Sequence, residues 1–312
     1  MQTIALFSDT HVGSSIGLIG QDEDVEGVRR PGLMLDDGHF VAASKLQKYL
    51  YEIWTDAWGR VLDIAGRSPL TIVSLGDITE NKHHGTHQVI SHQLSDHTRA
   101  ATYLLEEMFE RMAASQIHFI RGTPAHVGKG ASAEEGLARL FKKRGFPVVG
   151  DADTGNVSSL RRVLDVEGVR LDLAHRGRRG QRFSTSRSYP ALFAADVFGQ
   201  RMSETHRAMR ELEGGGASDE ELGAAWRTAR PPDVIVRAHH HSFIDTGLDR
   251  PSRKTRLIGL PCWQFSSEWV VNIGIESLPD HGLVVLQIDG QDVTCHPILY
   301  PVKRETPIKV TA

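Results

Sequence analysis

Five short apolar runs constrain the fold of this chain more than any other feature, because each of them ends at a polar residue suited to a binding site. The runs occupy residues 3–8, 70–75, 117–120, 169–174 and 233–238. Runs of this length predict buried strands, which read as nearly continuous hydrophobic segments when both faces are covered. Apolar residues at helical spacing predict helices over 42–65 and 97–114. Strands that alternate with helices predict an α/β architecture.

The remaining segments predict insertions into one large domain. Residues 14–40 are rich in Gly and Asp and predict a long loop, whereas 190–230 predicts two helices separated by EGGGAS. In the C-terminal third, the stretches VVNIGI, GLVVLQI and VTCHPIL predict strands of a second sheet. We find no internal repeat. We therefore expect a single domain over 1–312, with insertions near 14–65 and 190–230.

Composition limits the class of protein. The chain has 312 residues, 40% of them hydrophobic, and a formal net charge of −3 with a pI near 6.6, so whole-molecule attraction to nucleic acid is not expected. Cys262 and Cys295 form no disulfide framework and indicate a reducing compartment. No signal peptide precedes the first strand, and no uncharged apolar run approaches the ~18 residues that span a bilayer. We expect a soluble cytoplasmic protein without a membrane partner, and the oligomeric state is not predicted.

Metal-binding residue types gather at the ends of the predicted strands. Asp9 and His11 follow the first run, Asp77 follows the second, His175 the fourth and His239–His241 the fifth. Singly, the two aspartates could be helix caps or turn residues, and His175 could be a satisfied core histidine. Together they would be a costly set of buried polar groups without a function. Mixed oxygen and nitrogen ligands suit Mn, Fe or Zn better than Mg or Ca.

The motifs DxH, GD, a His after a strand and HxH, in that order, resemble the calcineurin-like metallophosphoesterase superfamily, whose pattern is DxH, GD, GNH, a later His and GHxH. The stretch RGTPAHVG is closest in style to phage- and prophage-encoded members. The resemblance implies a four-layer α/β/β/α β-sandwich flanked by helices, with two divalent ions at the strand ends; Mn(II) is favoured, and Zn(II) or Fe is possible. By matching motif positions, it implies one metal held by Asp9, His11, Asp77 and His241, and a second held by Asp77, His175 and His239.

The chain departs from that pattern at GNH. Thr123 stands at the Asn position and Pro124 at the His position, and His126 follows two residues later. A threonine hydroxyl is a poorer ligand than an amide oxygen, so Thr123, water or His126 could complete the second metal site. Because Pro124 fixes φ and restricts the residue before it, the loop could carry His126 back over the metals. We favour His126 as the proton donor to the leaving group over His126 as a ligand, and interpret the site as a working variant.

Two further clusters predict contacts with substrate. A polar loop and helix face is the favoured interpretation of the histidines after Asp77, and a contact of His83 or His84 with a substrate phosphate is the alternative. The stretch HRGRRGQRFSTSR begins at His175, so its arginines should lie beside the metals, where guanidinium groups bind phosphate oxygens bidentately. The arginines that we assign to substrate are Arg176, Arg178 and Arg179.

These features predict a metal-dependent phosphoesterase in which hydroxide held between two metals attacks phosphorus. The arginines and the phage-like resemblance favour a phosphodiester substrate in nucleic acid, and hence a phosphodiesterase or nuclease. A phosphomonoesterase acting on nucleotides or phosphoproteins is the first alternative. A non-catalytic, metal-bound scaffold that binds phosphate groups is the second, and fold-level analogy does not choose between them.

Overall fold

Two facing β-sheets form the centre of the protein in the computed structural model. The structure describes residues 1–83, 85–128, 132–152, 154–176, 210–211, 214–216, 218–221, 232–247, 255–272 and 278–302. The first sheet has the strand order β14-β13-β1-β5-β6-β7, and the second has the order β11-β12-β10-β9-β8. The strands of the first sheet are β1 (Gln2–Phe7), β5 (Leu70–Ser74), β6 (Gln116–Ile120), β7 (Ser158–Ser159), β13 (His281–Asp289) and β14 (Asp292–Tyr300). Those of the second are β8 (Arg161–Val166), β9 (Val169–Ala174), β10 (Val234–Arg237), β11 (Ile244–Asp245) and β12 (Arg256–Gly259).

All five predicted strands are confirmed, as β1, β5, β6, β9 and β10. In the first sheet β1, β5 and β6 run parallel to one another, and in the second β9, β10 and β12 do so. The carboxyl ends of parallel neighbours meet at one edge of a sheet. The residues that follow these strands are thereby brought together.

Alternation along β1 shows how the chain fills two cores. Ile4 and Leu6 belong to the core between the sheets, whereas Ala5 and Phe7 belong to the core beneath the helices. All four side chains are buried, because this central strand is covered on both faces. On the helix side, Trp54 packs edge-on against Phe7, with ring centroids 5.5 Å apart.

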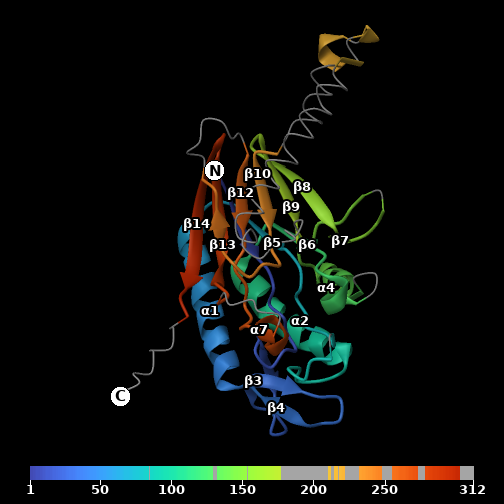
Figure 1. The fold of residues 1–312 in the computed structure, drawn as a ribbon, viewed down its shortest axis with the longest axis vertical. Helices are drawn as coiled ribbons and strands as arrows, with labels where there is room; N and C mark the ends of the chain where they lie inside the picture. The colour runs from blue at the N-terminus through green and yellow to red at the C-terminus, as the bar shows by residue number, and fades with distance from the viewer. Residues whose placement is uncertain are drawn as a thin grey trace.

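Helices cover the outer face of the six-stranded sheet (Figure 1). The predicted helices are confirmed as α1 (Lys45–Ala65) and α2 (Leu94–Met112). Ser44 begins α1 through a capping box with Gln47, in which each side chain bonds the other residue's backbone N–H. The short α3 (Pro124–Val127), α4 (Ser132–Lys143) and α7 (Glu268–Asn272) complete the described helices that have an assigned range.

The predicted loop at 14–40 is wrong in part, because it contains a small sheet at one end of the molecule (Figure 1). Its strands are β2 (Gln21–Glu23), β3 (Arg29–Met34) and β4 (Phe40–Ala42). The Asp24 carboxylate accepts the backbone N–H groups of Glu26 and Val28 and so closes the β2–β3 turn. The Gly and Asp content that predicted a loop belongs to hairpin turns.

Two predictions for the C-terminal third are also corrected. Residues 270–272 lie in α7 rather than in a strand, and the Ser267 hydroxyl accepts the Val270 N–H at the start of that helix. GLVVLQI and VTCHPIL do form strands, β13 and β14. However, β13 pairs with β1, so these strands extend the first sheet, and β8 to β12 make the second.

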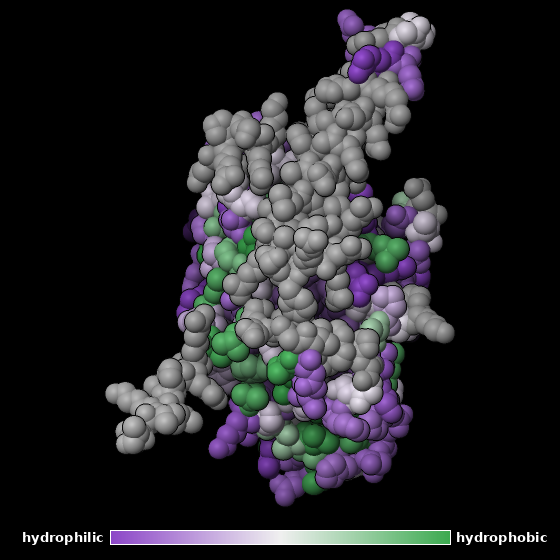
Figure 2. Space-filling view, in the orientation of Figure 1, coloured by the Kyte–Doolittle hydropathy of each residue, from purple (hydrophilic) through white to green (hydrophobic). Residues whose placement is uncertain are grey.

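The predicted α/β sandwich is confirmed as a mixed α/β fold with several sheets. The described residues trace three of the four predicted layers, and most of 190–230 lies outside them. On the face drawn in Figure 2, hydrophobic residues of the described part gather in the lower half, among hydrophilic ones. No helix among the described residues is both long and apolar enough to cross a membrane.

Candidate metal centre

The loops after four strands meet at one edge of the sandwich. The backbone N–H of Asp9 donates to Gly76 O at 2.9 Å, and that of His11 donates to Asp77 O at 3.1 Å. In the second sheet, Ala238 N donates to His175 O at 3.0 Å, and between the sheets His239 N donates to Asp9 Oδ2 at 3.2 Å. These bonds join the ends of β1 and β5 in one sheet and of β9 and β10 in the other. The polar residues that the sequence placed at strand ends therefore share one buried region.

The backbone of this region is unusually strained. Eight non-glycine residues of the described chain have positive φ, and the set includes Asp9, His11, Asp77, His239 and His241. Left-handed backbone is unfavourable for residues with a Cβ and clusters at functional sites. Five of these eight residues are predicted metal ligands, which marks the strand ends as more than ordinary turns.

One group of donor atoms comprises Asp9, His11 and His241, which lie within 4.8 Å of one another. His241 Nε2 lies 3.2 Å from Asp9 Oδ1 and 3.4 Å from His11 Nε2. His11 Nδ1 lies 2.6 Å from a carboxylate oxygen of Glu80. Because Nδ1 donates to that carboxylate, His11 presents Nε2 to the group, and such a tie to a carboxylate is common for metal-binding histidines.

A second group comprises Asp9, Asp77, His175 and His239. His175 Nδ1 donates to Leu75 O at 2.6 Å, so Nε2 is left facing the carboxylates. That Nε2 is buried and makes no hydrogen bond, although Asp77 Oδ2 is 2.9 Å away. A buried imidazole nitrogen aimed at two carboxylates without a hydrogen bond has the geometry of a metal ligand. Asp9 belongs to both groups and joins them.

Opposite charges are concentrated in these groups. Burial opposes charge on both partners, but the charge of His175 holds the pKa of Asp77 well below its usual range. Against the same burial, Asp77 and Asp9 raise the pKa of His175 to about 9, and Glu80 raises that of His11 to about 10. A divalent cation that binds here would displace these protons.

The loop after β6 contacts Asp77 closely. The Thr123 N–H donates to Asp77 Oδ1 at 2.6 Å, and the Thr123 hydroxyl lies 3.2 Å from both carboxylate oxygens. A Cβ added to Gly122 would come closer than 3.0 Å to Asp77, so only glycine fits there. Thr123, predicted as a possible ligand, is thus placed where it holds the carboxylate of Asp77.

The structure brings His126 into the centre through α3. Pro124 begins this one-turn helix, and His126 Nδ1 donates to Glu80 O at 2.9 Å. One ring nitrogen lies within 4.8 Å of donor atoms of His11 and Asp77. Burial and the neighbouring His11 lower the pKa of His126 to about 4, which favours a neutral imidazole at pH 7.

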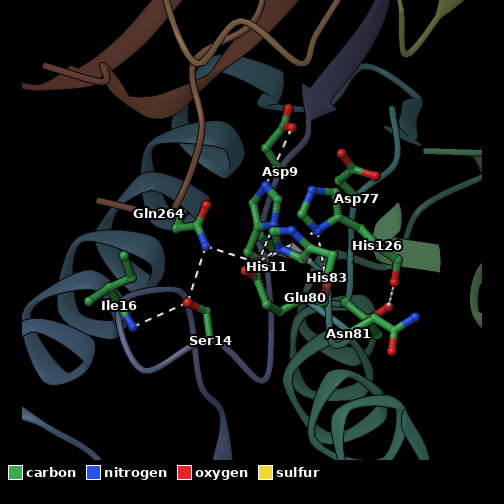
Figure 3. A network of polar contacts seen from close by, with 12 residues as sticks. Asp9, His11, Ser14, Ile16, Asp77, Glu80, Asn81, His83, His126 and Gln264 are labelled. Carbon is green, nitrogen blue, oxygen red and sulfur yellow. Dashed lines mark hydrogen bonds and ion pairs between the residues drawn. The ribbon is translucent and has the colours of Figure 1, made fainter. Parts of the chain in front are cut away.

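Sequence reasoning missed Glu80 and Gln264, which hold this side of the centre (Figure 3). The buried Glu80 carboxylate accepts from His11, from His83 Nε2 at 2.8 Å and from Gln264 Nε2 at 2.9 Å. The spacing of Glu80, three residues after Asp77, is the one signal that could have found it. Nothing in the sequence distinguishes Gln264 from a surface glutamine.

The predicted substrate contacts are less completely placed. His84, Arg178 and Arg179 lie outside the described residues. Arg176 is described, directly after His175, and is exposed. His83 is tied to Glu80 and lies against His126, with ring centroids 4.2 Å apart.

No protein family profile matches the chain, and no curated protein matches it. Among solved structures it is similar to Vps29 from Entamoeba histolytica complexed with zinc, at 10% identity and a TM-score of 0.36, over 96% of this chain and 99% of that one. A novel archaeal phosphodiesterase gives the same identity and TM-score over 95% and 100%. A predicted phosphoesterase from Streptococcus pneumoniae gives 10% and 0.33 over 96% and 93%. Likeness this weak carries no argument about function, which rests on the geometry of this chain.

Proposed function

We propose that the protein is a dinuclear-metal-dependent phosphoesterase whose preferred reaction is the hydrolysis of a phosphodiester. One observation carries the proposal. Two largely buried groups of aspartate and histidine donors share Asp9, and five of their six residues, all except His175, lie on left-handed backbone at the ends of strands from both sheets. Strain of this kind persists when function requires it.

The donor set fits two divalent transition-metal ions. We propose Asp9, His11, Asp77 and His241 as ligands of one ion, and Asp77, His175 and His239 as ligands of the other. Asp77 rather than Asp9 is the shared ligand in this assignment, which its position within 4.8 Å of a His11 nitrogen supports. The buried Nε2 of His175, which faces Asp77 and Asp9, supports this assignment, and the mixture of imidazole and carboxylate donors suits Mn(II), which we favour, as well as Zn(II) or Fe. When bound, such ions polarise a phosphate ester and make water a nucleophile near neutral pH.

The protein's own residues hold this arrangement and move a proton. Thr123 and Glu80 orient Asp77 and His11 through the hydrogen bonds described above. We propose that His126 donates a proton to the departing oxygen of the substrate, with ligation of the second ion as the alternative role. The alternative gains support from the lowered pKa of His126, because a neutral imidazole binds metal whereas a proton donor must first take up a proton.

A nucleic-acid phosphodiester is the substrate that we favour, because the arginine-rich stretch leaves the centre directly after His175. Arg176, Arg178 and Arg179, together with His84, are proposed to contact phosphates outside the reacting group. A phosphomonoesterase acting on nucleotides or phosphoproteins is the first alternative. A non-catalytic scaffold is the second.

The deciding experiment loads the purified protein with Mn(II) or Zn(II) and assays a chromogenic diester, the matching monoester, and single- and double-stranded DNA. Two ions per chain with faster turnover of the diester and of DNA support the proposal. Preference for the monoester supports the first alternative. One ion and no turnover of any substrate support the scaffold, and a chelated sample is the control.

Substrate binding is tested by replacing Arg178 and Arg179 together with Ala. We expect KM for DNA to rise by roughly tenfold at low salt and its salt dependence to weaken, because fewer phosphates are neutralised. The small chromogenic diester should be turned over nearly as before. An equal loss of activity on both substrates would contradict this role and would indicate that the two arginines act at the reacting centre.

A further inference from the structure

Glu134 is a buried carboxylate that the proposed reaction does not use. It lies in the first turn of α4 and its side chain is fully buried. Neighbouring positions of α4, such as Leu137 and Phe141, belong to the core beneath the helices. An acid at such a site requires hydrogen bonds that compensate for its loss of hydration.

Both bonds of the Glu134 carboxylate go to the loops of the proposed metal centre. Oε2 accepts the Gly122 N–H at 2.7 Å, and Oε1 accepts the Ile78 N–H at 3.5 Å. Ile78 directly follows Asp77, and Gly122 directly precedes Thr123, which donates to Asp77. One carboxylate thus holds the loop that carries Asp77 and the loop that orients it.

The loops after β5 and β6 lie in such close contact that the distance between them can change only a little. A Cβ on Gly76 would come within 2.5 Å of Gly122 N, and a Cβ on Gly122 would collide with Asp77. Little room remains for either loop to move toward the other. A tie that fixes both loops to one helix therefore fixes the Asp77 carboxylate.

We propose that Glu134 is a positioning residue of the metal centre, which holds the loops after β5 and β6 at the separation that Asp77 needs to bind metal. The inference rests on the proposed function for the metals and extends it to a residue that contacts no metal. Groups that hold metal ligands in place typically contribute about 10- to 100-fold to metal affinity.

Glu135 provides a matched control on the same helix. Its carboxylate accepts the N–H groups of Val157 and Ser158 and the Ser158 hydroxyl, and it pairs with Arg139 at 2.7 Å. Glu135 also lies 3.5 Å from the Arg121 guanidinium, so it ties α4 to β7 and, through the Arg121 side chain, to the end of β6, whereas Glu134 accepts the backbone N–H groups of Ile78 and Gly122 in the metal loops. Loss of either residue should destabilise the fold, but only loss of Glu134 should weaken metal binding.

The test compares wild type, Glu134→Gln and Glu135→Gln by calorimetric titration of each metal-free protein with Mn(II) alone. We expect two ions in wild type, an affinity about 10- to 100-fold lower in Glu134→Gln, and wild-type affinity in Glu135→Gln. Amide hydrogen exchange of the metal-free proteins should show faster exchange at Gly122 in Glu134→Gln only. If Glu134→Gln does not fold, Glu134→Asp replaces it, because it keeps the carboxyl group and retracts it by one methylene.

Wild-type affinity in Glu134→Gln, or an equal loss in both glutamate variants, would overturn the inference and leave the proposed function standing. A wild-type protein that binds no Mn(II) would instead overturn the proposed function and, with it, the role of Glu134. The number of Mn(II) ions bound by wild type therefore tests the proposed function. The ratio of Mn(II) affinities between the two glutamate variants tests the role of Glu134.

Discussion

His118, within β6, and His175, at the end of β9, are equally buried, each 2% exposed, yet their surroundings move the pKa of the two imidazoles in opposite directions. His118 accepts from Arg162 at 3.2 Å and donates to the Gln116 amide oxygen, and burial beside that guanidinium lowers its pKa to about 4. His175 has one nitrogen without a hydrogen bond, faces Asp77 and Asp9, and has a raised pKa. Burial alone does not distinguish the two histidines, whereas a ring nitrogen that faces two carboxylates sets His175 apart.

The largest expected effect comes from the carboxylate opposite His175. Asp77→Asn should lower activity by roughly 10⁴-fold, because an amide cannot supply two anionic oxygens to a pair of ions. Steady-state rates on a chromogenic diester, with metal content from mass spectrometry, measure the loss. Near-normal turnover with two ions bound would show that Asp77 does not bridge the two ions.

His126→Ala separates the two roles of His126. As a proton donor, His126 should matter about 10²–10⁴-fold for DNA, whose leaving group is strongly basic, and little for a nitrophenyl diester, whose leaving group departs unaided. Both ions should then remain bound. Loss of one ion, with equal loss of both activities, would show that His126 is a ligand, as we propose for His175, and no loss at all would leave it without a role.

The contrast between the two buried histidines is tested directly by His175→Gln and His118→Gln. Metal affinity should fall about 10- to 100-fold or more in the first variant and stay unchanged in the second, because His175 Nε2 faces the carboxylates of the proposed centre, whereas both His118 nitrogens bond other groups. Titration of the metal-free proteins with Mn(II) measures both. Equal Mn(II) affinities in the two variants would show that His175 and His118 do not differ in their contribution to metal binding.

The smallest effect is on stability and concerns His118. Because the folded pKa is about 4 and the usual value is 6.5, the unfolded chain binds the proton that the folded protein excludes between those values. The free energy of unfolding should therefore fall as pH drops from 6.5 toward 4. His118→Gln should reduce the difference between pH 7 and pH 4.5 by about 2 kcal/mol, as measured by urea unfolding. An unchanged difference would show that burial of His118 is not what excludes the proton.

Part of the candidate site could be predicted from the sequence alone. Asp9, Asp77, His175 and the pair His239 and His241 were predictable, because apolar strands with polar ends have a readable pattern and the structure places those ends together. The residues around His126 depart visibly from the motif that the sequence otherwise resembles, but the pattern does not predict the one-turn helix that they form.

Other features were beyond prediction because they depend on tertiary contacts. Glu80, Glu134 and Gln264 belong to no recognisable motif, and only packing shows that they are buried against the centre. VVNIGI has the composition of a strand, yet the Ser267 cap begins a helix there. The sequence also does not show that β13 belongs to the first sheet, because β13 pairs with β1 and these two strands lie far apart in the chain.

That pairing has a consequence for synthesis on the ribosome. β1 is complete at Phe7, yet its antiparallel neighbour β13 ends at Asp289, and the Trp263 N–H that bonds Asp9 O is also made late. At ordinary translation rates, about 5–20 residues per second, β1 keeps one open edge for roughly 15 to 60 s. Unpaired edges attract other strands, so we expect the nascent chain to depend on chaperones that shield its N-terminal strand until the C-terminal hairpin emerges.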